Sequence, residues 1–250
     1  MGGWRRGALP GSSSLRVGPL VRLANVHAGY RRHLRQRPVL HDVSWMARPG
    51  EVTALVGPNG VGKTTTFRLL LGVLAPRRGT VSVGAHRPGT YRIRHGVGFL
   101  PERRSRLPGW TVSALVRAGC ALAGGGPDHP AICMEELGLT ALGGRTVDSL
   151  SRGEARATLL AFALAGDPGL VLLDEPWSGL DPGARDRLRS RLAHLRARQR
   201  TVVVSSHELL EVARVADRIV VMANGTVARA VARGTLGPEA LERAVTRTFG

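Results

Sequence analysis

The stretch LVGPNGVGKTTT, residues 55–66, contains the only lysine of a 250-residue chain. The sequence has 36 lysine and arginine residues, and 35 of them are arginine. Residues 57–64 match the pattern G-x-x-x-x-G-K-[ST], with an apolar, strand-like segment before it and helically spaced apolar residues after it. In this context the glycines let successive backbone N–H groups surround an anion at a helix N-terminus. The pattern therefore predicts a nucleoside triphosphate site, in which Lys63 reaches the β- and γ-phosphates and Thr64 coordinates Mg²⁺.

The bulk composition is that of a globular chain. A length of 250 residues suits one large domain or two small ones, and 43% of the residues are hydrophobic. No window approaches the ~18 consecutive apolar residues of a membrane span. Residues 1–19 are rich in Gly, Ser and Pro and lack an apolar core, so we expect a disordered leader rather than a signal peptide. Cys120 and Cys133 have no metal-site spacing and are expected to be reduced thiols.

The net charge of +18 raises the question of a nucleic-acid partner. Arginine is scattered over the whole sequence, however, and few apolar or aromatic residues are interleaved with it, which favours a solvated basic surface over a nucleic-acid site. Nucleic acid is therefore not the expected partner. A cationic face beside an anionic membrane surface is a third possibility.

Strand-like and helix-like segments alternate along the chain. Strands are predicted over residues 20–30, 39–47, 52–56, 79–87, 96–101, 170–173 and 201–205, with a strand pair ending near 232. Helices are predicted over 62–74, 112–122, 131–142, 152–165, 182–198 and 209–215. This order predicts an α/β fold with a mostly parallel core sheet, an N-terminal antiparallel β region and a helical insert at about residues 102–149.

A pair of carboxylates follows a buried strand in LVLLDEP, residues 170–176. The carboxyl end of a strand is where open α/β sheets bind ligands. We expect Asp174 to help hold Mg²⁺ and Glu175 to act as the general base that deprotonates a water. Standing alone, the pair would equally fit a capping acid before a helix, but the phosphate-binding pattern upstream favours the catalytic interpretation.

Together, these segments resemble the ATP-binding cassette (ABC) family. Residues 150–182, LSRGEARATLLAFALAGDPGLVLLDEPWSGLDP, resemble its signature helix, Walker B strand and D-loop. His207 matches the switch histidine, and Tyr30, 27 positions before Gly57, matches the aromatic residue that stacks on adenine. The similarity covers roughly residues 20–232, and five motifs in the same order are far more specific than any one of them. We therefore expect an ABC cassette over residues 20–250.

The resemblance implies a set of roles around ATP and Mg²⁺. The catalytic residues would be Lys63, Glu175 and His207. The nucleotide contacts would be Tyr30, Gly57, Pro58, Asn59, Gly60, Val61, Gly62, Lys63, Thr64, Thr65, Glu102, Ser151, Gly153 and Asp181. The metal would be held by Thr64, Glu102 and Asp174. Two cassettes would pair head to tail, so that Ser151 and the Gly153 amide of one subunit meet the ATP of the other; Ser151 would also suit the N-cap of its helix.

Three positions depart from the family pattern. Glu102 stands in place of the Q-loop glutamine, and a carboxylate can still ligate Mg²⁺. Arg152 replaces a glycine of the signature, where a side chain could crowd the nucleotide of the partner or, pointing inward, add a cation to it. Glu154 replaces the signature glutamine and places an anion near that site. Because the catalytic acid and the switch histidine are present, we expect a working ATPase, and the alternative is a weakened signature function in a heteromeric pair.

The resemblance also implies partners. A single cassette without a membrane span needs a separately encoded membrane permease, which residues 102–149 and the Glu102 loop would receive. Residues 96–115 resemble ABC-2-type bacterial exporters, which favours export and a cytoplasmic location on the inner face of the cell membrane. The alternative is a soluble ABC ATPase that acts on nucleic acid or as an assembly or regulatory factor. Translation factors usually carry two cassettes in one chain, whereas this chain shows one. Chromosome-organising ATPases place a long coiled coil between the glycine loop and the signature, whereas here only 87 positions separate Lys63 from Leu150.

Overall fold

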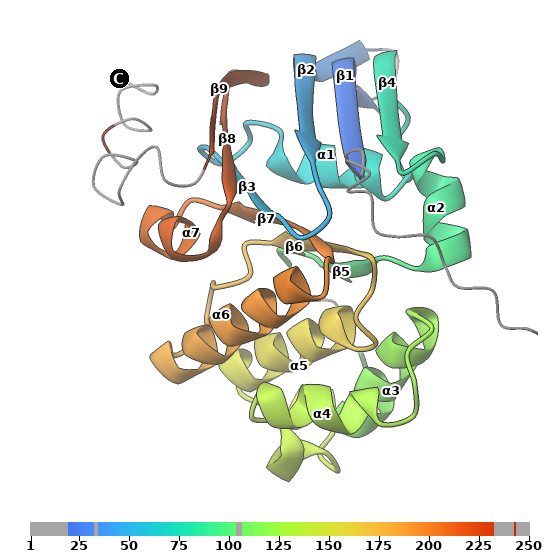
Figure 1. Ribbon diagram of the computed structural model, residues 1–250, viewed down its shortest axis with the longest axis vertical. Coiled ribbons are helices and arrows are strands. Elements are labelled where there is room, and N and C mark those ends of the chain that lie inside the picture. Colours follow the sequence, from blue (N-terminus) through green and yellow to red (C-terminus); the bar gives the residue numbers. More distant parts are fainter. Residues whose placement is uncertain (1–19, 33–34, 104–106, 233–242, 244–250) are drawn as a thin grey trace, which may run out of the picture.

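The computed structural model describes residues 20–32, 35–103, 107–232 and 243, so the predicted leader, residues 1–19, lies outside it (Figure 1). The strands are β1 Val21–Arg32, β2 Arg35–Ala47, β3 Val52–Val56, β4 Arg78–Val83, β5 Gly98–Leu100, β6 Leu170–Asp174, β7 Thr201–Ser206, β8 Arg218–Ala223 and β9 Thr226–Ala232. The α-helices are α1 Lys63–Leu70, α2 Pro88–His95, α3 Val112–Leu122, α4 His129–Glu136, α5 Arg152–Leu164, α6 Pro182–Ala197 and α7 Leu209–Val215. Two short 3₁₀ turns lie at Thr140–Leu142 and Val147–Ser149.

The central sheet has six strands in the order β5-β6-β7-β3-β8-β9. All neighbouring pairs from β5 to β8 are parallel, and only β9 joins antiparallel to β8. The expected mostly parallel core sheet is confirmed. The parallel neighbours in this sheet are distant in sequence because each parallel connection crosses over through other elements.

Alternate side chains of the central strands face two separate apolar cores. Ala54, Val204 and Leu173 belong to the core shared with α3, α5 and α6. Leu55 and Leu172 belong to the core shared with α1 and the antiparallel sheet. Strands covered on both faces become continuous apolar runs, which is why residues 170–173 carry no polar side chain.

A second sheet covers the α1 side of the molecule. It has three antiparallel strands in the order β2-β1-β4, which confirms the expected N-terminal antiparallel region. The predicted strand, Pro49-Gly50 turn and strand are also present. However, β2 and β3 belong to different sheets, so this turn passes the chain from one layer to the next and closes no hairpin.

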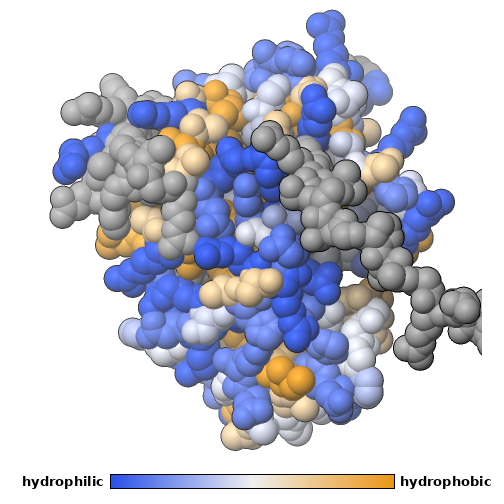
Figure 2. Space-filling view, in the orientation of Figure 1, coloured by the Kyte–Doolittle hydropathy of each residue, from blue (hydrophilic) through white to orange (hydrophobic). Residues whose placement is uncertain are grey.

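The helices α3 to α6 form the layer on the other side, below the sheet in Figure 1. Helix α3 has the predicted bounds, and Thr111 caps it by accepting a hydrogen bond from the Ala114 amide at 3.3 Å. Helix α2 was not predicted, because only Pro88 and Tyr91 of its eight residues are buried and no apolar period marks it. Hydrophilic residues cover most of the face in Figure 2, with hydrophobic ones in small groups. Within the described residues, no helix is long and apolar enough to span a membrane.

Two helices end earlier than the sequence predicted, for one physical reason. Helix α1 stops at Leu70 rather than 74, and α4 stops at Glu136 rather than 142. Gly72 and Gly138 follow with φ of 69° each, and their amides donate to carbonyls within the last helical turn. This αL glycine arrangement satisfies the final carbonyls and turns the chain away, whereas the apolar period continues beyond it.

Replacing Gly72 with Ala should destabilise the fold by about 1–3 kcal/mol, because φ is positive there and an added Cβ would clash with the Gly89 backbone. The measurement is the free energy of unfolding from urea titrations. Gly124→Ala is the matched control, since Gly124 has φ of 70° and no atom within 4 Å of the added Cβ. Equal losses in the two variants would contradict the clash.

Candidate functional site

Four adjacent parallel strands end at the same level of the central sheet. In the ladder Leu100 is level with Leu173, Asp174 with Ser205, and Ser205 with Leu55. The segments that leave these four ends therefore emerge side by side. They carry Glu102 after β5, Asp174 and Glu175 at β6, His207 after β7 and the glycine loop after β3, which brings the predicted residues of four distant segments to one edge.

The glycine loop, residues 57–62, connects β3 to the first turn of α1. Gly62 is the N-cap of α1 with φ of 116°, and a Cβ there would clash with Leu40. The Lys63 side chain is 6% exposed and folds back over the loop. Its Nζ donates to the Gly57 carbonyl at 2.6 Å and lies 3.5 Å from the Pro58 carbonyl. The ammonium therefore lies inside the ring of backbone that the pattern predicts as a phosphate cradle.

Asp174 receives two hydroxyl groups from neighbouring elements. Thr64 Oγ1 donates to Asp174 Oδ2 at 2.8 Å, and Ser205 Oγ donates to Oδ1. The carboxylate is 1% exposed, so these bonds replace the water that it has lost. The structure thus brings together Thr64 and Asp174, two of the three predicted metal ligands, as a pair of hard oxygen atoms.

Glu175 points toward both of the other predicted catalytic side chains. Its Oε1 lies 3.4 Å from Lys63 Nζ, and its Oε2 lies 3.0 Å from His207 Nδ1. Its carboxylate is 8% exposed, whereas the His207 side chain is 61% exposed and lies at the rim. A buried carboxylate between an ammonium and an imidazole is suited to accept a proton from a water in that cavity.

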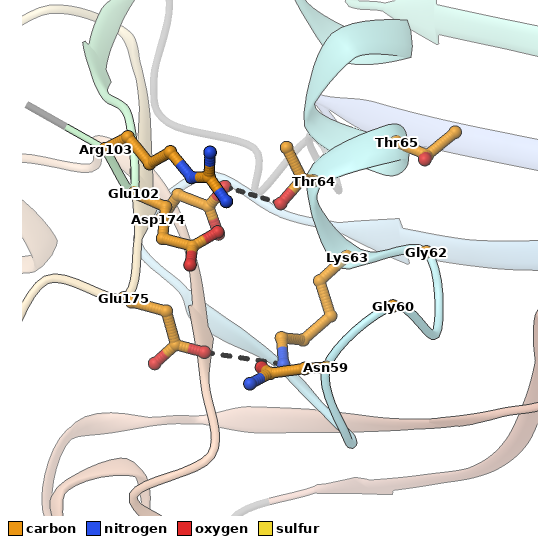
Figure 3. A pocket seen from close by; sticks show the side chains of 10 residues that line it. All are labelled: Asn59, Gly60, Gly62, Lys63, Thr64, Thr65, Glu102, Arg103, Asp174 and Glu175. Atoms are coloured by element: carbon orange, nitrogen blue, oxygen red, sulfur yellow. Dashed lines mark hydrogen bonds and ion pairs between the residues drawn. The ribbon is translucent and has the colours of Figure 1, made fainter. Parts of the chain in front are cut away.

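A cavity of about 330 Å³ opens between the glycine loop and the strand ends (Figure 3). It is lined by Asn59, Gly60, Gly62, Lys63, Thr64, Thr65, Glu102, Arg103, Asp174 and Glu175. In Figure 3 Lys63 and Asn59 lie on one side, and Arg103 and Glu102 lie opposite. Sequence reasoning did not single out Arg103, whose one signal was its position next to Glu102.

Tyr30 lies beside this cavity on the antiparallel sheet. Its hydroxyl is 3.0 Å from Thr65 Oγ1, and the Arg68 guanidinium lies 5.3 Å from its ring centroid. Helix α1 therefore links the predicted adenine-stacking residue to the phosphate cradle through Thr65. A guanidinium over the ring adds a cation–π contact.

Seven predicted nucleotide contacts do not line this cavity. Gly57, Pro58 and Val61 belong to the glycine loop itself and Tyr30 contacts Thr65, whereas the other three lie on different elements. Ser151, Gly153 and Asp181 lie at the starts of α5 and α6, and a Cβ on Gly153 would lie 3.2 Å from the Gly179 carbonyl. Asp181 caps α6 by accepting from the Ala184 amide at 2.8 Å. These residues form a second group, separate from the glycine loop of the same chain.

The N-terminus of α5 explains the substituted Glu154. Ser151 Oγ accepts from the Glu154 amide at 3.3 Å, and Glu154 Oε2 accepts from the Ser151 amide at 2.7 Å, which confirms the predicted N-cap as a full capping box. These hydrogen bonds, and then the nearby Arg145 charge, lower the pKa of Glu154. The carboxylate is thus bound to its own helix, and Arg152 beside it is exposed.

Two further residues that contact the end of β6 were not predicted from the sequence. Ser205 binds both Asp174 and the Glu175 amide, and its only sequence signal is its position two residues before His207. Arg156 is a buried cation of α5 that reaches the carbonyls at the end of β6. Nothing in the spacing of charged residues marked Arg156 among 35 arginines.

The chain is similar to known proteins of one family. The profile of the family described as "ABC transporter" matches residues 40–178. An uncharacterized ABC transporter ATP-binding protein of Rhizobium meliloti is 33% identical over 80% of this chain and 77% of its own length. The Nod factor export ATP-binding protein I of Mesorhizobium japonicum is 34% identical over 86% of this chain but 63% of its own length, so this chain spans less than two thirds of that relative.

Solved structures agree on the fold. A structure described as the ATP-binding subunit of an ABC transporter has a TM-score of 0.80 and 26% identity, covering 91% of this chain and 99% of that one. A dimeric ATP-binding cassette in a post-hydrolysis state with ADP and phosphate has a TM-score of 0.77 and 22% identity, covering 86% and 100%. The second likeness bears on the fold alone.

Lys63→Arg should lower ATP hydrolysis by about two orders of magnitude, because a planar guanidinium does not fit the cradle that holds the compact ammonium. The measurement is steady-state phosphate release. Arg78→Lys, a swap at an exposed cation of β4, is the control and should leave hydrolysis unchanged. Normal turnover in Lys63→Arg would show that the cradle does not discriminate between the two cations.

Proposed function

The chain belongs to the ABC transporter family and is an ATPase, and on this premise we propose that it drives export through a separately encoded membrane permease. The observation that carries the proposal is the contact of Glu175 with both Lys63 and His207 at the rim of the glycine-loop cavity. That contact joins a phosphate-binding cation, a base and an imidazole in one place. The names of the relatives, which include export ATP-binding proteins, support the direction of transport.

In this proposal the cavity binds the triphosphate of ATP. The backbone N–H groups of residues 59–65 and the Lys63 ammonium hold the phosphates, and Tyr30 stacks on adenine. Glu175 takes the proton of the attacking water, and His207 contacts the γ-phosphate. Lys63 and the amides supply positive charge where negative charge develops in the transition state, which lowers the barrier to transfer.

Magnesium fits the oxygen atoms that surround this cavity. Thr64 Oγ1 and Asp174 Oδ2 lie 2.8 Å apart, and Glu102 lines the same cavity. The described residues contain no cluster of three or more His, Cys, Asp or Glu side chains that would hold an ion by itself. Mg²⁺ is commonly held by one or two protein oxygen atoms together with substrate phosphates, so this donor set suits it. When bound, Mg²⁺ would neutralise phosphate charge.

The proposal includes a second ABC subunit, identical or different. Ser151, Gly153 and Asp181 lie apart from the cavity of their own chain, which suits contacts with the nucleotide of a partner. We assign residues 20–250 to the cassette and about 102–149 to a helical subdomain that receives the permease. The alternative, a soluble ABC ATPase that acts on nucleic acid or in assembly, has no support among the relatives named above.

Glu175→Gln should retain ATP binding, lower turnover by about 10²–10⁴-fold and trap an ATP-bound dimer, because the amide cannot accept the proton of the water. Phosphate release, nucleotide binding and size-exclusion chromatography with ATP measure these outcomes. Glu211→Gln is the matched control, since Glu211 of α7 is another buried glutamate but pairs with Arg189 of α6. Wild-type turnover in Glu175→Gln would remove Glu175 as the base.

The charge of the chain supports a place beside an anionic membrane. Residues 1–101 hold 16 of the 36 cations but only two of the 18 acids, Asp42 and Glu51. Arginine is spread evenly over the sequence, so the asymmetry comes from the missing acids rather than from arginine usage. On α2 (Figure 1), Arg92 and Arg94 are exposed on either side of Ile93, which is 81% exposed. An apolar side chain between cations suits an anionic lipid surface.

Vesicles of phosphatidylglycerol should therefore bind the protein in flotation assays, and vesicles of phosphatidylcholine should not. Replacing Arg92 and Arg94 with Gln should weaken this binding by roughly tenfold or more, at about 1 kcal/mol per cation. Replacing Arg117 and Arg229, exposed cations of α3 and β9, is the control for net charge. Equal weakening by both pairs, or DNA binding that persists near physiological salt, would contradict this location.

A further inference from the structure

A buried arginine of the signature helix connects the two loops that line the cavity. Arg156 lies on α5 and is 8% exposed. Its Nη1 donates to the carbonyls of Pro101 and Glu102, at 2.6 and 3.3 Å. Its Nη2 donates to the carbonyls of Asp174 and Glu175, at 2.7 and 2.8 Å. One terminal amino group therefore serves the loop after β5, and the other serves the end of β6.

The charge of Arg156 is matched to this position. Burial lowers its pKa, and the carboxylates of Asp174, Glu102 and Glu175 act in the opposite direction. Arginine remains protonated in proteins, so the guanidinium persists as a buried cation. A buried cation costs several kcal/mol unless it is hydrogen-bonded, and here four backbone carbonyls accept hydrogen bonds from its two terminal amino groups. Such a residue has a more specific role than filling space.

The backbone around Glu175 shows what Arg156 holds in place. Glu175 has φ of 49°, a left-handed conformation that is uncommon for a residue other than glycine. Its amide donates to both the carbonyl and the hydroxyl oxygen of Ser205, each at 3.1 Å. These two hydrogen bonds restrict the rotation of the peptide group before Glu175. Arg156 binds the carbonyls on both sides of the Glu175 Cα. Both peptide planes are thus held, and with them the direction of the Cα–Cβ bond that carries the carboxylate.

We propose that Arg156 is a positioning residue that holds the general base Glu175 and the Glu102 loop at a fixed separation. The inference deepens the proposed function, since it rests on Glu175 being the base. The same helix begins at Ser151, which in that proposal meets the nucleotide of the partner. In this arrangement, a movement of α5 at the nucleotide of the partner would be transmitted through the planar guanidinium of Arg156 to Glu175, the base at the nucleotide of its own chain. A lysine has one ammonium group and cannot serve both pairs of carbonyls.

The test compares Arg156→Gln and Arg156→Lys with wild type in the full chain. Both variants should lower kcat by about tenfold or more, because small displacements of a catalytic group cost up to about 100-fold. Binding of a non-hydrolysable ATP analogue should stay within threefold of wild type, as neither variant touches the phosphate cradle. Arg156→Lys keeps the positive charge but cannot bind both pairs of carbonyls, so a loss of kcat in both variants assigns the effect to the guanidinium fork rather than to the charge.

Arg191→Gln is the matched control for burial. Arg191 is 3% exposed on α6 and binds Glu136, Asp167 and the Leu164 carbonyl, away from the cavity. It should lower Tm without lowering kcat per folded molecule. Wild-type kcat in a folded Arg156→Lys, or an equal loss of kcat in Arg191→Gln, would overturn the inference. Turnover by Glu175→Gln would instead overturn the proposed function, so the two failures are distinguishable.

Discussion

The common level of four parallel strand ends is the constraint on which the site depends. Hydrogen bonding in the ladder sets Leu100, Asp174, Ser205 and Leu55 within one residue of a line across the sheet. A slip of one residue in any strand would exchange its two apolar faces and move its last side chain away from the cavity. The two cores therefore hold the register, and the register brings the catalytic groups together.

The charged side chains of Lys63, Asp174 and Glu175 at this edge are buried, and each needs a partner. Asp174 receives hydroxyls from Thr64 and Ser205, and Glu175 lies between Lys63 and His207. Since an unpaired charge in such a place would be costly, each partner constrains the position of the next. Lys63 fits among them as a compact ammonium against two carbonyls, which gives a physical reason why the only lysine stands there.

Sequence patterns predicted most elements and missed those whose cause is local geometry or long-range contact. The spacing of apolar residues predicted C-terminal ends of α1 and α4 that lie too far along the chain, because it takes no account of the αL glycines at 72 and 138. Helix α2 buries only Pro88 and Tyr91, so its sequence has no helical spacing of apolar residues from which it could be predicted. The strands β2 and β3, joined by a short turn, would suggest a hairpin, yet they lie in different sheets.

By itself, the sequence determined the α/β class, the family and the residues of the glycine loop and the acid pair, because short contiguous patterns carry that chemistry. Only the tertiary structure decided which side chains meet. Arg156 and Ser205, 49 positions apart, both bind the peptide group between Asp174 and Glu175, and no local pattern records that meeting. The partners of Arg156 are backbone carbonyls, which every residue has, so no residue type in the sequence indicates them. The contact is defined only when the sheet and α5 pack together.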